Sequence, residues 1–330
     1  MTEPDHSFAA AAQGDLRSSK RNASGPFARR RRLSWRLRKS VLELGERTLV
    51  MGVVNVTPDS FSDGGRFLEP ERAVEQALRL MQEGASVVDF GAESTRPGSH
   101  AGDVRQATVS AAEEMDRLLP PLEMLLRERP DVIVSIDTYK AETARAALRA
   151  GADIINDVSG FQWDSAMPQV CAEAQCGVVL MHTRGKPDEW LHQQPLIPAS
   201  IGTLVWDGLA HSLQMAIQAG MAEEAVVLDP GYGFGKRMGE NFALLLQQEK
   251  LLELERPLLV GLSRKSFLRW AMEARLGREV RSEASMEAAS IAGLTAAVLS
   301  GASIVRVHSV RAAVEAVALA DVLLDAAEPA

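Results

Sequence analysis

A short apolar run that ends in a polar residue recurs eight times along this chain. The runs are rich in Val, Ile and Leu and do not alternate with polar residues, which is typical of strands buried on both faces. Segments with helical spacing separate them, as at Val74, Ala77, Leu78 and Met81. Eight strand–helix units predict an α/β fold, a (β/α)8 TIM barrel whose active site lies at the carboxyl ends of its strands. The expected strands are 49–55, 87–93, 132–137, 154–157, 178–182, 226–229, 258–265 and 304–308, and the expected helices are 71–83, 104–128, 140–150, 164–175, 201–219, 240–254, 266–274, 283–300 and 310–325.

The charge is distributed unevenly along the 330 residues. Residues 1–40 contain ten Lys/Arg and three Asp/Glu, a net charge of +7, and since the whole chain carries −8, residues 41–330 carry −15. We expect residues 1–40 to be a disordered basic extension and residues 41–330 to be the barrel, which needs about 250 residues. Deletion of residues 1–40 should then leave activity and melting temperature nearly unchanged.

Four consecutive arginines at 29–32 raise the alternative that the extension contacts nucleic acid or targets the chain. No aromatic or structured segment accompanies the arginines, and acidic residues nearby argue against a transit peptide. The disordered extension is therefore the favoured interpretation, and the acidic barrel is a poor partner for nucleic acid.

Cysteine content and hydropathy indicate a cytoplasmic protein without a membrane partner. No apolar stretch reaches the roughly 18 residues of a membrane span. The only cysteines, Cys171 and Cys176, are too few for a disulfide framework. We interpret them as two reduced core thiols in preference to a metal clip.

The first and eighth strands are neighbours in such a barrel, and their polar ends suggest a phosphate or pyrophosphate subsite. Asn55 ends the first strand; its amide either caps a turn, the commoner role, or binds a hard cation. Arg306 and His308 alternate with valines, so both project to the same side. Two anion-binding groups at the start of a helix form a phosphate site. The alternative is that both side chains pack inside the barrel, which is costly for an unpaired Arg.

Asp137, Asn156 and Asp229 end the third, fourth and sixth strands. Buried carboxylates need hydrogen-bond donors, and no Lys or Arg lies beside Asp137 or Asp229 in the sequence. A heterocycle with an amino group and a ring N–H satisfies a carboxylate with two hydrogen bonds. The alternative is a pair of metal-ligating Asp residues, which lacks evident further ligands. His182 is interpreted as a hydrogen-bonded barrel histidine.

Two segments near the sixth and seventh strands add groups for an aromatic anion. Residues 263–266 read Ser-Arg-Lys-Ser and lead into a helix, so Ser266 lies near a helix N-terminus, which binds carboxylates. In residues 229–236 three glycines surround Phe234, which can cover an aromatic ligand. The glycine spacing does not match a dinucleotide-binding fingerprint. Two long connections, residues 57–65 and 183–200, are expected to be lids or binding loops.

Over residues 41–325 these motifs resemble the dihydropteroate synthase family of the folate pathway. The motifs are NVTPDSFSDGG at 55–65, ESTRPG at 93–98, SIDT at 135–138, INDV at 155–158, LDPG at 228–231, GFGK at 233–236, SRKS at 263–266 and RVH at 306–308. The family condenses 6-hydroxymethyl-7,8-dihydropterin diphosphate with 4-aminobenzoate and releases pyrophosphate.

The resemblance implies a role for each matching residue. Asn55 touches Mg²⁺, with Thr95, Arg306 and His308 near the pyrophosphate. The pterin is held by Asp137, Asn156, Asp229 and Lys265, and the aminobenzoate by Phe234, Arg264 and Ser266. Asp137, Lys265, Arg306 and His308 form the catalytic set. Breaking of the C–O bond leads, and the arylamine traps a cationic pterin methylene. The resemblance also implies a homodimer formed by outer helices near the C-terminus.

The chain departs from the family pattern at Thr183, Glu240 and Ser309, where the family often has Met, His and Asp. Ser309 removes the usual carboxylate neighbour of His308. Two other functions remain as alternatives. A methyltransferase acting on methyltetrahydrofolate shares the barrel and the pterin carboxylates but does not need the 263–266 segment or the Arg306–His308 pair. A non-catalytic paralogue binds pterin without turnover.

Overall fold

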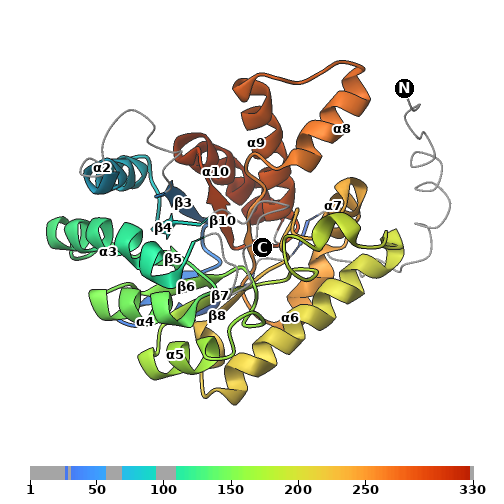
Figure 1. The fold of residues 1–330 in the computed structure, drawn as a ribbon. Coiled ribbons are helices and arrows are strands. Elements are labelled where there is room, and N and C mark those ends of the chain that lie inside the picture. Colours follow the sequence, from blue (N-terminus) through green and yellow to red (C-terminus); the bar gives the residue numbers. More distant parts are fainter. Residues whose placement is uncertain (1–26, 29–30, 57–68, 94–108, 328–330) are drawn as a thin grey trace.

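The computed structural model describes residues 27–28, 31–56, 69–93 and 109–327, and their core is an eight-stranded parallel barrel (Figure 1). Its strands are β3 (Leu49–Asn55), β4 (Val87–Gly91), β5 (Val134–Asp137), β6 (Ile154–Asp157), β7 (Gly177–Met181), β8 (Val226–Asp229), β9 (Leu259–Val260) and β10 (Ile304–Val307). Strand β3 pairs with both β4 and β10, and β10 pairs with β9. A parallel bridge between Leu228 and Leu258 joins β8 to the start of β9 and closes the ring. The TIM-barrel prediction is confirmed.

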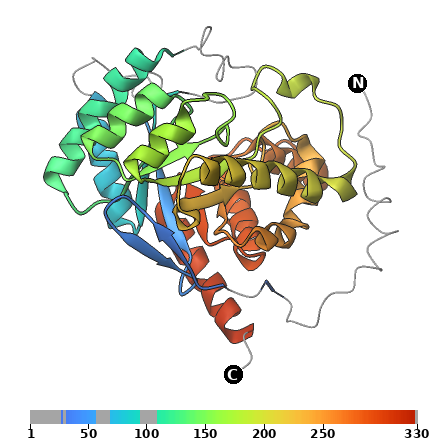
Figure 2. The same cartoon turned by 90° about the horizontal axis from the view of Figure 1, so that it is seen from below.

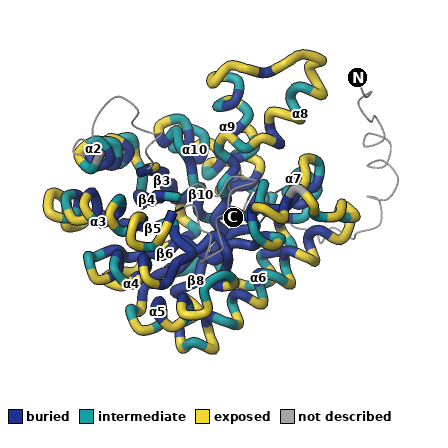
Figure 3. The backbone as a smooth tube through the Cα atoms, viewed as in Figure 1, coloured by how far each residue is buried: buried dark blue, intermediate teal, exposed yellow. Residues whose placement is uncertain are grey.

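Helices surround the strands, with burial concentrated at the centre and exposure on the outer helix faces (Figure 3). They are α2 (Glu69–Gln82), α3 (Ala111–Glu128), α4 (Ala141–Ala150), α5 (Met167–Ala174), α6 (Ile201–Gln218), α7 (Met238–Leu245), α8 (Ser266–Leu276), α9 (Glu283–Leu299) and α10 (Val310–Ala327). Short 3₁₀ helices η2 (Trp190–His192), η3 (Pro198–Ser200), η4 (Glu223–Ala225) and η5 (Gln248–Leu254) complete the described connections. The helix expected at 240–254 is thus divided into α7 and η5.

The strand expected at 258–265 is much shorter than the sequence suggested. Only Leu259 and Val260 pair with β10. The chain then turns, with a backbone hydrogen bond from Lys265 to Leu262 (3.3 Å) and Arg264 at φ +60°. A left-handed residue cannot continue a strand, so the polar segment 263–265 forms a loop at the barrel rim.

A two-stranded hairpin closes the amino-terminal end of the barrel (Figure 2). Strands β1 (Leu33–Arg36) and β2 (Val41–Leu44) are antiparallel. Trp35 is fully buried among the first residues of the barrel strands, and its indole N–H donates to the Ala225 carbonyl at 3.1 Å. The expected domain start at residue 41 is therefore wrong, because β1 belongs to the folded barrel. Residues 1–26 of the expected disordered extension lie outside the described residues.

Two further sequence expectations concern the chain as a whole. Among the described helices, none combines the length and apolar character needed to cross a membrane. Cys171 and Cys176 are both buried and carry free thiols.

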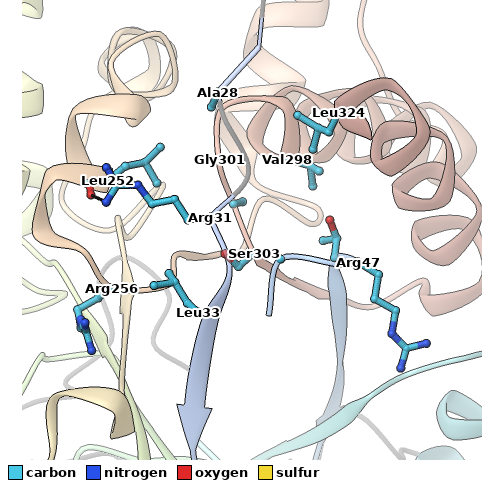
Figure 4. A pocket seen from close by; sticks show the side chains of 13 residues that line it. Ala28, Arg31, Leu33, Arg47, Leu252, Arg256, Val298, Gly301, Ser303 and Leu324 are labelled. Carbon is cyan, nitrogen blue, oxygen red and sulfur yellow. Dashed lines mark hydrogen bonds between the residues drawn. The ribbon is translucent and has the colours of Figure 1, made fainter. Parts of the chain in front are cut away.

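A small cavity of about 30 Å³ lies beside the hairpin (Figure 4), lined by residues that include Arg31, Leu33 and Arg47. It has room for about two water molecules and lies at the end of the barrel away from the polar strand ends.

Candidate active site

The carboxyl ends of the strands bring together side chains that are far apart in the sequence. Arg306 on β10 donates from Nη2 to Asp137 Oδ2 at the end of β5 (2.7 Å) and from Nε to Asp89 Oδ2 on β4 (2.6 Å). Asn156 at the end of β6 donates to the same Asp89 oxygen (3.2 Å), and Ser135 donates to the other (2.5 Å). One connected polar network therefore spans four strands of the barrel.

Asp89 is the anchor of this network, and the sequence interpretation missed it. Its side chain is fully buried, and a buried carboxylate requires paired donors. The sequence does indicate a buried functional carboxylate here, because Asp89 interrupts an otherwise apolar run that was expected to be buried on both faces. No Lys or Arg lies beside Asp137 in the sequence, but the fold supplies a cation, Arg306, from 169 residues away.

Two carboxylates share the one guanidinium, and this sets the charge at the centre of the site. Burial raises the pKa of Asp137; Arg306 opposes this rise and Asp89 adds to it. Burial alone would lower the pKa of Arg306, but Asp89 and Asp137 raise it, so the guanidinium stays charged. The side chains of Asp137 and Arg306 are 18% and 22% exposed, so both still reach the open end of the barrel. The network carries a net negative charge when both acids are ionised.

Asp229 at the end of β8 lies in a second charged group with two lysines. Its Oδ1 accepts from the Gly231 N–H at 2.7 Å. Burial raises the pKa of Asp229 to about 6, and this hydrogen bond and the nearby Lys265 and Lys236 limit the rise. Burial, with Arg306 nearby, lowers the pKa of Lys265 to about 8. Asp229 and Asp137 oppose this fall, so both carboxylates act electrostatically on Lys265.

The loop after β8 is held in place by Lys236, whose side chain was not assigned a role from the sequence. Its ammonium donates to the carbonyls of Gly231 (2.7 Å), His182 (3.2 Å) and Phe234 (3.3 Å). Burial lowers the pKa of Lys236 to about 7. The loop so fixed presents Phe234 to Lys265, whose ammonium lies 3.9 Å from the ring centroid. The residues expected to hold the aminobenzoate and those expected to hold the pterin are therefore in direct contact.

The segment after β9 supplies the groups expected to meet anions. His308 Nδ1 lies 3.0 Å from the Ser263 hydroxyl, which gives the imidazole a hydrogen-bond partner in this segment. Arg264 is exposed, and its backbone N–H donates to the Ser290 hydroxyl at 3.0 Å. Ser266 is exposed and is the first residue of α8, as expected for a carboxylate site at a helix N-terminus.

The buried position expected for His182 is confirmed, but its hydrogen bonding differs from expectation. Its ring packs against Gly208 of α6, where an added Cβ would lie 2.5 Å from Cδ2. Within the described residues, Nδ1 has no hydrogen-bond partner. Burial lowers its pKa well below the usual value. His182 forms hydrogen bonds through its backbone: its N–H donates to the Asp229 carbonyl, and its own carbonyl accepts from the Lys236 ammonium.

The predicted metal and pyrophosphate residues are only partly described. Asn55 ends β3 with an exposed side chain. Thr95 and the connection 57–65 lie outside the described residues. Among the residues that the structure places, no group of three His, Cys, Asp or Glu side chains could hold a metal ion. A single amide oxygen nonetheless suits Mg²⁺, which commonly takes one or two protein oxygens together with substrate phosphates and waters.

A second buried ionic cluster, also unforeseen, supports the rim next to β4. The Lys140 ammonium pairs with Glu93 (2.5 Å) and Glu114 (3.3 Å). Thr143 and Thr138 donate to the same Glu114 oxygen at 2.7 and 3.1 Å. Burial raises the pKa of Glu114, which Lys140 opposes. Glu93 begins the motif that contains Thr95, and within the described residues the cluster holds the Glu93 side chain just beyond β4.

Comparison with known proteins identifies the family. The model of the pterin binding enzymes matches residues 51–308. A dihydropteroate synthase from Synechocystis is 39% identical over 290 residues, covering 86% of this chain and 93% of that protein. The solved Xanthomonas albilineans dihydropteroate synthase with 4-aminobenzoic acid has a TM-score of 0.77 at 36% identity, covering 91% of this chain and 100% of that one. The same enzyme in complex with 7,8-dihydropteroate has a TM-score of 0.74 at 34% identity, with coverages of 90% and 100%. The chain therefore belongs to the pterin binding enzymes and, among them, to the dihydropteroate synthases of folate biosynthesis.

Proposed function

We propose that the polar end of this barrel condenses 6-hydroxymethyl-7,8-dihydropterin diphosphate with 4-aminobenzoate, giving 7,8-dihydropteroate and pyrophosphate. One observation carries this proposal: buried acids and cations are paired at the polar end of the barrel. Arg306 donates to Asp137 at 2.7 Å, and both Asp137 and Asp229 act electrostatically on Lys265. The solved relatives bound to 4-aminobenzoic acid, the second substrate of this proposal, and to 7,8-dihydropteroate, its product, support this assignment.

The pterin is assigned to Asp137, Asn156, Asp229 and Lys265. An ionised carboxylate has room for about four hydrogen bonds, and Asp229 receives one of them from Gly231. It can therefore accept from an amino group and a ring N–H of the heterocycle. Such a site discriminates strongly against analogues without those donors, because the buried acceptor would remain unpaired.

Opposite charges develop on the two fragments as the C–O bond breaks, and the site offers groups for both. The C–O bond breaks, its electron pair stays on the diphosphate oxygen, and the pterin methylene becomes cationic. The arylamine nitrogen then bonds to that carbon and loses a proton. The carboxylate of Asp137 stabilises the positive methylene, while Arg306, His308 and Lys265 stabilise the leaving diphosphate. Thr95 is assigned to the diphosphate as well.

Mg²⁺ is assigned to the diphosphate side, with Asn55 as the protein ligand. When bound, the ion would neutralise charge on the leaving group. The exposed amide at the end of β3 fits this role because Mg²⁺ would take its remaining ligands from phosphate oxygens and water.

The 4-aminobenzoate is assigned to Phe234, Arg264 and Ser266. Phe234 covers the aromatic ring, and the carboxylate lies at the N-terminus of α8, where Ser266 begins the helix. Arg264, exposed at the rim, adds a cation beside that carboxylate.

A homodimer in the cytoplasm completes the proposal. Helix α10 exposes three apolar side chains, Leu319 (63%), Val322 (61%) and Leu323 (39%). Clustered exposed apolar residues mark association surfaces, and the family resemblance indicates a second copy of the chain as the partner. The two buried free thiols agree with a reducing compartment.

Turnover tests the proposal. The purified chain should release pyrophosphate only when dihydropterin diphosphate, 4-aminobenzoate and Mg²⁺ are all present, in step with dihydropteroate formation. Asp137→Asn should bind less pterin and lose most of this activity. Pterin binding without any release of pyrophosphate would instead identify a non-catalytic paralogue.

A further inference from the structure

The connection between β7 and α6 contains Trp190, an aromatic residue without a role in the reaction described so far. Trp190 lies in η2 and is 6% exposed. Its ring meets that of Phe234 edge to face, with centroids 5.3 Å apart and planes at 86°. The adjacent Gly235 fits closely beneath it, since an added Cβ would lie 3.0 Å from the Trp190 ring. The indole therefore packs directly on the loop that presents Phe234.

Phe234 is held by two different partners. Trp190 makes the edge-to-face contact, and the Lys265 ammonium lies 3.9 Å from the Phe234 ring centroid. The Phe234 backbone is fixed in addition by the Lys236 ammonium (3.3 Å). Trp190 and Lys265 thus contact the ring itself, while Lys236 holds the backbone of the loop.

Trp190 is itself anchored, so it can act as a fixed support. Its indole N–H donates to the Gly185 carbonyl at 3.1 Å. Arg184 ties the same connection to the β8 loop, donating to Gly235 (3.2 Å) and to Gln194 (3.0 Å). Arg184 thus links the residues on both sides of η2 to one another and to the loop that holds Phe234.

Glu240, one of the departures from the family pattern, completes this anchoring. Its carboxylate accepts from the backbone N–H of Leu196 (2.6 Å) and of Arg237 (2.7 Å). It also lies 3.7 Å from the Arg184 guanidinium, and both side chains are largely buried. Helix α7 is thereby fastened to the connection that carries Trp190.

We propose that Trp190 is a positioning residue that sets the angle of the Phe234 ring and so determines how tightly the arylamine substrate binds. This rests on the proposed function, because Phe234 covers the arylamine there. Trp190 acts through Phe234 and leaves the pterin residues Asp137, Asn156 and Asp229 untouched. An edge-to-face aromatic pair typically changes an equilibrium about two- to tenfold.

The test compares Trp190→Leu with wild type and with two further variants. Trp190→Leu should raise the KM for 4-aminobenzoate about two- to tenfold, with the KM for dihydropterin diphosphate and kcat changed less than about twofold. Trp190→Phe keeps an aromatic edge and should recover most of the loss. Trp206→Leu is the control, because it also removes an indole, one that is partly buried on α6 directly after the same connection. It should lower the melting temperature without changing either KM.

The KM values and a crystal structure of Trp190→Leu test this inference, and wild-type turnover tests the proposed function. Equal 4-aminobenzoate KM values in wild type and Trp190→Leu, or a parallel rise of both KM values in Trp190→Leu and Trp206→Leu, would overturn the positioning role. A crystal structure of Trp190→Leu judges it without activity, since an unmoved Phe234 ring contradicts the inference. Wild-type protein that makes no dihydropteroate refutes the proposed function alone.

Discussion

Replacing Asp229 by Asn should make the stability of the ligand-free chain less sensitive to pH. Asp229 is 7% exposed, and burial raises its pKa from 3.8 to about 6. Between these two values the folded chain holds a proton that the unfolded chain has released. The wild-type free energy of unfolding must therefore fall as the pH rises through this window. The amide in Asp229→Asn has no such proton to hold, so the variant lacks this contribution.

The size of the effect follows from the shift of about two pKa units, which corresponds to about 3 kcal/mol. The stability of Asp229→Asn relative to wild type should thus increase by up to about 3 kcal/mol between pH 4 and pH 6.5, and then level off. The Asn side-chain oxygen can still accept from the Gly231 N–H. Any constant cost of the amide shifts the whole curve without changing its slope.

Urea unfolding at several pH values in this range measures the difference. Other acids with raised pKa values, such as Asp157, are common to both proteins and cancel. A difference in stability that stays constant with pH, or that falls as the pH rises, would refute the reasoning that Asp229 is buried at the expense of stability.

Further predictions concern the hairpin and the lysine over Phe234. Trp35→Ala should lower the free energy of unfolding by about 3–5 kcal/mol, measured by urea unfolding, because Trp35 is fully buried in the barrel end. Deletion of residues 1–40 should be equally damaging since it removes β1, and unchanged stability would show that the hairpin is dispensable. The pKa of Lys265, lowered to about 8, should make kcat/KM for dihydropterin diphosphate fall as the pH rises through about 8 and the ammonium is lost. Lys265→Arg should move that decline to higher pH, and an unmoved profile would assign it to another group.

The barrel could be predicted because its strands are specified locally. Strands β3, β6 and β8 begin and end at the expected residues, since continuous Val, Ile and Leu runs have one stable arrangement between helices. The polar strand ends followed from the same pattern. Leu33 to Arg36 were missed because a basic composition concealed the alternation that buries Trp35.

The pairing of charges in the site could not be predicted, because it depends on which strands face one another across the barrel. The guanidinium of Arg306 finds Asp89 and Asp137 at sequence separations of 217 and 169 residues. The contact between Lys265 and Phe234 likewise joins two loops from different strands. Sequence motifs named most of these residues, but only the fold shows that they act on one another.

The central claim is that buried carboxylates at the barrel end bind the pterin, and pterin affinity tests it most directly. Calorimetric titration of 6-hydroxymethylpterin into wild type and Asp229→Asn, at a pH above 7 where the Asp229 carboxylate is ionised, isolates this contact from the diphosphate. An amide cannot accept from both ring donors, so the variant should lose about 1–3 kcal/mol of binding free energy, roughly a five- to 150-fold weaker Kd. Phe234→Ala, which belongs to the arylamine half, should change pterin affinity far less. An Asp229→Asn variant that binds pterin as tightly as wild type would contradict the account.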